Sequence, residues 1–221
     1  MEELSDTPRA GAALLLAFTA CFFMLPRAAL GFDEAMPVAK PDVKIGDRWV
    51  YRRTDVITGR TQFEYEMRVT FVGPEAILAV AGRRGGELTT DLHSTAEWNP
   101  LLSDGYVYTP HGGWFKFPLT VGESHDSAYT TQKPNEDAKS ERKTVVVGWE
   151  DVVVPAGKFR ALKVEIKGTW QLVFGRAGGT TVQTIWYVPE VKRWVKFDYK
   201  NAWNGGGSGL SSELLEYSLQ K

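Results

Sequence analysis

The chain has 221 residues, of which 43% are hydrophobic, 12% aromatic and 24% charged, and its formal net charge is −1. This composition is too apolar and too balanced in charge for a disordered chain, and the length predicts one or two folded domains. The near-zero net charge argues against a nucleic-acid partner and against electrostatic binding to an anionic membrane.

Residues 1–31 are predicted to be a signal peptide. Residues 10–25 carry no charge, and Ala29-Leu30-Gly31 has the small-x-small pattern of a cleavage site, so we expect cleavage after Gly31. Two other fates stay open. The apolar run is a candidate membrane anchor, although it is shorter than the roughly 20 residues of a spanning helix, and Cys21 is a candidate site of lipidation.

Removal of the signal segment leaves equal numbers of basic and acidic residues, no cysteine and no membrane span. A chain without cysteine suits an oxidising compartment in which no disulfide is used. We therefore expect an exported protein, periplasmic or extracellular. Residues 32–41 are expected to be a mobile lead-in, and residues 42–221 a single domain.

Period-two alternation dominates residues 42–221 and predicts strands with one buried and one wet face. The apolar members of the clearest segments are Phe63, Tyr65, Met67, Val69, Phe71, Leu162, Val164, Ile166, Trp170, Leu172, Phe174, Val195, Phe197 and Tyr199, with Gly168 the one gap. No 3.6-residue period is sustained. The pattern predicts an all-β fold in which long antiparallel meander strands form a curved sheet or an open half-barrel.

Glycine and polar clusters mark the expected connections between strands. The glycine-rich residues 205–209 are expected to form a hairpin loop rather than a phosphate cradle, because strands lie on both sides. Residues 132–141 (QKPNEDAKSE) are the most polar interior stretch and are expected to be an exposed loop.

Residues 149–165 (WEDVVVPAGKFRALKVE) predict a tight hairpin. Pro155 suits the second position of a turn, and Gly157 suits the positive φ that closes a three-residue loop before Phe159. This turn pairs Val154 with Lys158.

The same register would place Val145 and Val147 on the face opposite Val164 and Ile166. One extra residue in the first strand would correct the parity and place Val147 beside Val164. Gly148 tolerates the required backbone, so a bulge is expected between Gly148 and Asp151.

Eight tryptophans are unusual for this length and have two readings, a filled core or an apolar pocket. Trp49 and Trp170 follow the apolar alternation and are expected in the core. Trp98, Trp114 and Trp203 lie near turns and are expected to be exposed. Core filling is the favoured reading for the set.

No motif for catalysis, metal binding or cofactor binding is present. The three histidines, His93, His111 and His125, lack metal-ligand spacing, and a cleaved chain has no nucleophilic cysteine. A pair of carboxylates on distant strands could serve a hydrolase without leaving a sequence motif. Hydrolysis is therefore kept as the least favoured alternative, with no catalytic residues assigned.

Four stretches together resemble a group of uncharacterised bacterial exported β-proteins. They are GWEDVVVPAGKFRALKVE, WYVPEVKRWVKFDY, VKIGDRWVY and FPLTVG, which begin at residues 148, 186, 43 and 117. The resemblance covers most of residues 41–220 and implies curved antiparallel sheets related in shape to periplasmic lipoprotein carriers. One departure is His125, where the group commonly has a tryptophan. The resemblance implies no catalytic residues.

These observations favour a non-enzymatic exported protein whose concave face binds an apolar or lipid-like ligand or a protein partner. The alternative is a structural or assembly factor of the cell envelope that binds no small ligand. The hairpin residues Gly148, Pro155, Gly157 and Phe159 are expected to set the architecture rather than an active site.

Overall fold

The computed structural model describes residues 34, 36–134 and 136–221, so the predicted signal segment, its cleavage site and Cys21 lie outside the described residues. The strands in chain order are β1 (Arg48–Asp55), β2 (Thr61–Val72), β3 (Ala76–Arg83), β4 (Thr90–Thr95), β5 (Pro100–Ser103), β6 (Tyr106–Thr109), β7 (Ser124–Lys133), β8 (Glu136–Val154), β9 (Gly157–Leu172), β10 (Gly178–Val188), β11 (Arg193–Trp203) and β12 (Gly206–Ser218), with a 3-10 helix η1 (Pro189–Val191) between β10 and β11. The all-β antiparallel prediction is confirmed.

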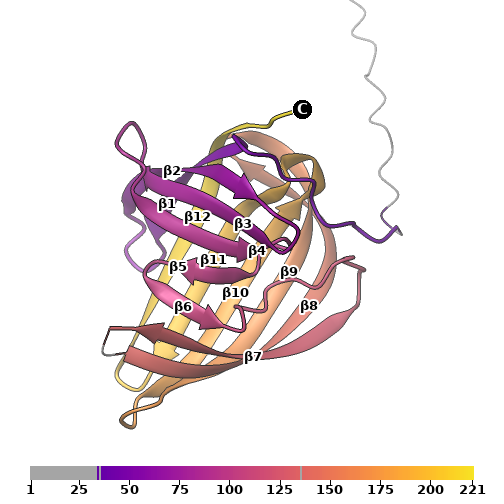
Figure 1. Cartoon of the computed structure of the whole chain (residues 1–221). Helices are drawn as coiled ribbons and strands as arrows, with labels where there is room; N and C mark the ends of the chain where they lie inside the picture. The colour runs from indigo at the N-terminus through magenta and orange to yellow at the C-terminus, as the bar shows by residue number, and fades with distance from the viewer. Residues whose placement is uncertain (1–33, 35, 135) are drawn as a thin grey trace, which may run out of the picture. The chain divides into compact units, whose positions relative to one another are not determined.

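The sheet is a closed barrel, which corrects the expected open half-barrel. Each strand pairs antiparallel with its neighbour in sequence, and β1 pairs with β12 to complete the circle (Figure 1). The closing ladder runs from Arg48 opposite Ser218 to Asp55 opposite Leu210. Closure joins segments from opposite ends of the domain, and local alternation contains no information about such a pairing.

The β8–β9 hairpin differs from the predicted register by one residue. Val154 pairs with Gly157, so the turn has two residues, and Gly157 has the expected positive φ of 139°. The ladder shifts between Val146 and Gly148, which makes Val147 the extra residue and places the bulge before the predicted stretch from Gly148 to Asp151.

The same shift decides which side chains of β8 face the interior. Val146 pairs with Val164 and Thr144 with Ile166, and all four are buried. Val145 and Val147, which were expected in these places, lie on the outer face. The shorter turn and the earlier bulge together account for the difference.

Within the stretch 132–141, expected to be an exposed loop, residues 132–133 belong to β7 and residues 136–141 to β8. Lys133 pairs with Glu136 across the turn between β7 and β8. Ala138 and Ser140 face the interior and are buried, whereas Lys139 is exposed. The stretch is polar because its inner face lines a partly polar cavity, described below.

One end of the barrel is filled by a packed core. Trp49 on β1 and Trp98 before β5 meet edge to face, with ring centroids 5.7 Å apart. Their indole nitrogens donate to the carbonyls of Val191 and Lys192, each at 2.9 Å. Trp98 therefore belongs to the core, whereas it was expected to be exposed. It does lie near a turn, but that turn folds over the end of the barrel.

Two further segments close this end. Phe115 is buried in the core, where its backbone exchanges hydrogen bonds with the Asn99 side chain. The amide of Ala156, at the tip of the β8–β9 hairpin, donates to the carbonyl of Leu214 on β12. Val38 is buried and pairs with Leu119, so the expected mobile lead-in is packed against the barrel at this position.

Within the described part of the chain, no helix has the length and apolar character needed to cross a membrane.

Candidate functional site

A cavity of about 610 Å³ occupies the other end of the barrel, where the β1–β2, β3–β4, β5–β6, β7–β8, β9–β10 and β11–β12 turns lie. Barrel diameter grows with strand number, and eight strands already enclose enough space for interior side chains or one small ligand. Twelve strands leave more room. The β8–β9 tip and Phe115 pack at the opposite end, and Trp114 of the same segment as Phe115 lines the cavity.

Aromatic rings form much of the cavity wall. Trp114 stacks on Phe197 with centroids 5.5 Å apart, and Trp194 lies 5.7 Å from Phe197. Trp170 also lines the cavity and donates from its indole nitrogen to the Asn201 side chain at 2.8 Å. Trp114, which was expected to be exposed, is half-buried in this wall, whereas Trp203 is exposed as expected.

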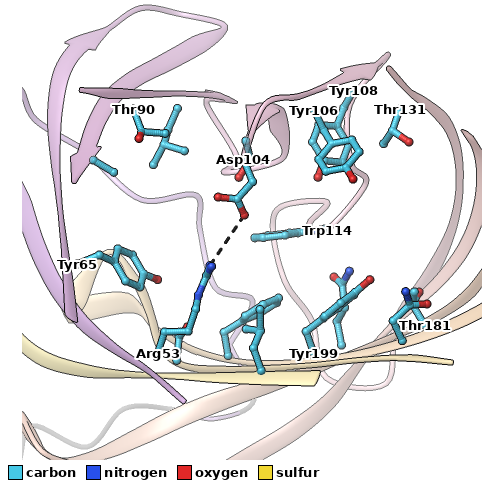
Figure 2. Close-up of a pocket in the computed structure, with 18 of the residues that line it drawn as sticks. Arg53, Tyr65, Thr90, Asp104, Tyr106, Tyr108, Trp114, Thr131, Thr181 and Tyr199 are labelled. Carbon is cyan, nitrogen blue, oxygen red and sulfur yellow. Dashed lines mark ion pairs between the residues drawn. The ribbon is translucent and has the colours of Figure 1, made fainter. Parts of the chain in front are cut away.

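Charged side chains are unevenly distributed in the cavity. Four arginines and two carboxylates line it: Arg53, Arg83, Arg142, Arg193, Asp104 and Glu136. Asp104, in the β5–β6 turn, points toward Arg53 on β1 from the opposite wall (Figure 2), and their charged atoms are 3.9 Å apart. Glu136, at the start of β8, accepts a hydrogen bond from the Tyr106 hydroxyl at 3.1 Å.

Arg142 and Arg193 have no carboxylate within ion-pair distance among the described residues. The Arg193 guanidinium lies 4.3 Å from the ring centroid of Trp98 and 5.2 Å from that of Trp194, so ring faces offset part of its charge. Arg142 donates to the Tyr129 hydroxyl at 3.1 Å and to the Thr169 carbonyl at 3.4 Å. The interior therefore has an excess of positive charge.

Several buried polar atoms on the cavity wall lack a hydrogen-bond partner among the described residues. They are Arg53 Nε, Thr181 Oγ1, Gln183 Oε1, Arg193 Nε, Trp194 Nε1 and Ser212 Oγ. Each unsatisfied buried polar group costs about 1–3 kcal/mol. Most buried polar groups in native proteins have a hydrogen-bond partner from the protein or from ordered water, so a cluster of such groups on one wall requires an explanation.

Neutral tyrosine hydroxyls surround the cavity as well. Burial raises the pKa of Tyr65, Tyr108 and Tyr199 above the ordinary value of a tyrosine. These hydroxyls therefore stay protonated at neutral pH and can donate hydrogen bonds. Figure 2 shows Tyr106 and Tyr108 side by side on the wall that also carries Asp104.

The residues singled out from the sequence lie at the packed end, away from the cavity. Pro155 lies in the β8–β9 turn and Gly157 begins β9 directly after it. Gly148 adjoins the bulge with a φ of 153°, and Phe159 contacts Tyr217 edge to face at 6.3 Å. Sequence reasoning missed the cavity residues Arg142, Thr181 and Gln183. One signal was available: Gly168, the gap in the apolar alternation, lies opposite Arg142.

The cavity brings together two carboxylates, the feature that the hydrolase alternative requires. Asp104 faces an arginine and Glu136 accepts from a tyrosine, as described above. Both lie near the open rim, one in a turn and one at a strand start.

No family model and no curated protein matches the chain. Among solved structures, a candidate lipoprotein from Parabacteroides distasonis is similar, with 13% identity over 83% of this chain and 100% of the other, at a TM-score of 0.53. A candidate exported protein with a YmcC-like fold from Bacteroides fragilis has 13% identity over 83% and 100%, at 0.43. The hypothetical lipoprotein YmcC from Escherichia coli has 9% identity over 79% and 86%, at 0.45. The first likeness supports the fold assignment.

Proposed function

We propose that the chain is an exported, non-enzymatic binding protein that holds one apolar or amphipathic small molecule in the open end of its barrel. The observation that carries this proposal is the cavity of about 610 Å³ with aromatic walls. Small-molecule sites commonly measure about 300–1,000 Å³ and combine apolar walls with a few polar groups.

Two independent lines support export. The sequence predicts a signal peptide, and the similar Parabacteroides protein is described as a candidate lipoprotein. An exported carrier or sensor of apolar molecules shields its ligand from water in a space of this kind.

The proposal is tested by titrating the purified protein with N-phenyl-1-naphthylamine, an uncharged apolar dye that fluoresces when it leaves water. We expect saturable uptake of one dye molecule per chain. If circular dichroism shows a folded β protein and no saturable dye uptake is measured, the proposal is contradicted.

The second candidate, an envelope assembly factor that binds a protein instead of a small ligand, is favoured by the apolar tips of the open rim. Ile57 in the β1–β2 turn, Phe174 in the β9–β10 turn and Trp203 at the end of β11 are exposed, Phe174 to 81%. A triple substitution of these side chains by serine separates the two functions. It abolishes capture of an envelope protein if the rim is a docking surface and leaves dye uptake intact.

A further inference from the structure

Resting on the proposed function, we propose that the ligand of the cavity is an amphipathic organic anion, and that its anionic group binds to Arg142, Thr181 and Gln183. These residues lie on β8 and β10 and line the same wall. The apolar body of the ligand lies against the aromatic and aliphatic wall opposite.

Arg142 is a buried cation whose partners are all neutral. It is 7% exposed, and its hydrogen bonds go to a tyrosine hydroxyl and a backbone carbonyl. Arginine stays protonated at every physiological pH, and a buried charge without a counter-ion is strongly unfavourable. Since no described carboxylate lies within ion-pair distance, an anion that enters the cavity would supply the missing charge.

The backbone of β9 lets Arg142 extend toward β10. Arg142 pairs with Gly168, and Gly168 pairs with Thr181 on the next strand. A Cβ atom at Gly168 would lie 2.7 Å from the Cδ of Arg142, so the arginine stem lies over the space that any other side chain would fill. Its Nη1 atom reaches the carbonyl of Thr169 on this strand.

Thr181 and Gln183 complete the subsite. They are 2% and 6% exposed, and neither Thr181 Oγ1 nor Gln183 Oε1 has a hydrogen-bond partner within the described residues. Two residues apart on one strand, they face the same side at a spacing of about 7 Å. The Arg142 guanidinium and the Thr181 hydroxyl can donate to a carboxylate, sulfate or phosphate oxygen, and the Gln183 side chain can donate only from its Nε2 atom, because Oε1 is an acceptor.

The opposite wall accounts for the apolar part of the ligand. Met67 on β2, Ala81 on β3 and Leu92 on β4 line the cavity there, and Trp194 and Phe197 lie nearby on β11. The two carboxylates of the cavity are at the rim, where Arg53 and Tyr106 already contact them. A molecule with one anionic end and one apolar end matches both walls.

The test compares decanoate with 1-decanol, which have the same chain length and differ in charge, as competitors of N-phenyl-1-naphthylamine. A charge-assisted hydrogen bond contributes about 1.5–3 kcal/mol, so decanoate should displace the dye at a concentration at least roughly tenfold lower than decanol. Dye binding with equal displacement by both competitors overturns the anionic subsite and leaves the proposed function standing. Absence of dye binding overturns both.

Three variants locate the subsite. Arg142→Met should bind dye and lose the preference for decanoate. Thr181→Val has the same shape without the hydroxyl, so it should fold with an unchanged or higher urea midpoint while its decanoate affinity falls about threefold to tenfold, because one hydrogen bond is lost. It keeps the proposal testable should Arg142→Met fail to fold.

Ser127→Ala is the matched control, because the Ser127 hydroxyl is buried and unpartnered among the described residues but does not line the cavity. Its decanoate preference should equal that of the unmodified protein. A Thr181→Val variant that keeps the full preference for decanoate would contradict the subsite.

Discussion

The Arg142 side chain lies over Gly168, the residue that it faces on the neighbouring strand, and its Nη1 atom donates to the adjacent carbonyl of Thr169 at 3.4 Å. The missing side chain at Gly168 is therefore a structural requirement. It lets a charged group enter the barrel interior from β8 and lie along the wall of the cavity.

Gly168→Ala should destabilise the protein by about 1–3 kcal/mol, as overpacked core substitutions do. The added Cβ atom would lie 2.0 Å from the carbonyl oxygen of Glu141, so β8 and β9 would have to separate. Urea unfolding followed by circular dichroism measures the change. Gly86→Ala is the control, because it lies in an exposed turn where an added Cβ atom would be 3.3 Å from the nearest atom. An equal loss of stability in both variants would contradict the close approach of β8 to Gly168.

Trp49→Phe should lower the free energy of unfolding by about 2–4 kcal/mol, through a smaller ring and a lost hydrogen bond. Trp49 is fully buried, and its indole nitrogen donates to the carbonyl of Val191 at 2.9 Å, which would be left unpaired. The same substitution at the exposed Trp203 should change stability by less than about 0.5 kcal/mol. Similar unfolding midpoints for the two variants would contradict a place for Trp49 in the core at the packed end of the barrel.

Glu66→Gln should weaken the contact between β1 and β2 in a pH-dependent way. Hydrogen bonds from Arg48 at 2.8 Å, and then from Arg68 at 2.7 Å, hold the pKa of Glu66 below the ordinary glutamate value. The ionised carboxylate thus stabilises the fold above its unfolded pKa, and this contribution is lost as pH falls through the lowered folded value.

At neutral pH the variant should be less stable by about 1–2 kcal/mol, because a hydrogen bond to a charged group contributes about 1.5–3 kcal/mol and a neutral one about 0.5–1.5 kcal/mol. The difference should shrink as the pH falls below the ordinary glutamate range. Glu87→Gln, at an exposed residue outside the described ion pairs, should follow the unmodified protein at every pH. A pH-independent effect of Glu66→Gln would show that the charge of the carboxylate is not what stabilises the contact between β1 and β2.

The sequence predicted the strands wherever one face packs against an apolar core. The alternation of Leu162, Val164 and Ile166 identified their buried face correctly, because these residues contact the packed interior. It failed for residues 132–141, where the inner face of β8 carries Ala138 and Ser140 toward a partly polar cavity. A binding cavity removes the hydrophobic contrast on which strand prediction depends.

The candidate site was less accessible to sequence reasoning than the fold. Arg142 is far in sequence from Thr181 and Gln183 and meets them only through the pairing of β8, β9 and β10. Closure of the barrel, which creates the enclosed space, depends on pairing between the first and last strands. Local sequence patterns predict neither the proximity of Arg142 to Thr181 nor the pairing of β1 with β12. The glycine at residue 168 did mark the place where Arg142 approaches β10.

Filling the cavity from within tests the central claim most directly. Ala138 faces the cavity from β8, and the adjacent Lys139 faces outward, so Ala138→Trp and Lys139→Trp place the same ring on opposite faces of one strand. Both variants should fold, since one ring enters an open space and the other enters solvent.

The measurement is the affinity of each variant for N-phenyl-1-naphthylamine, with circular dichroism and urea unfolding to establish that both are folded. Lys139→Trp should bind one dye molecule per chain like the unmodified protein, and Ala138→Trp should bind at least roughly tenfold more weakly because its indole occupies the ligand space. A folded Ala138→Trp variant that binds the dye as tightly as Lys139→Trp would contradict a ligand site inside the barrel.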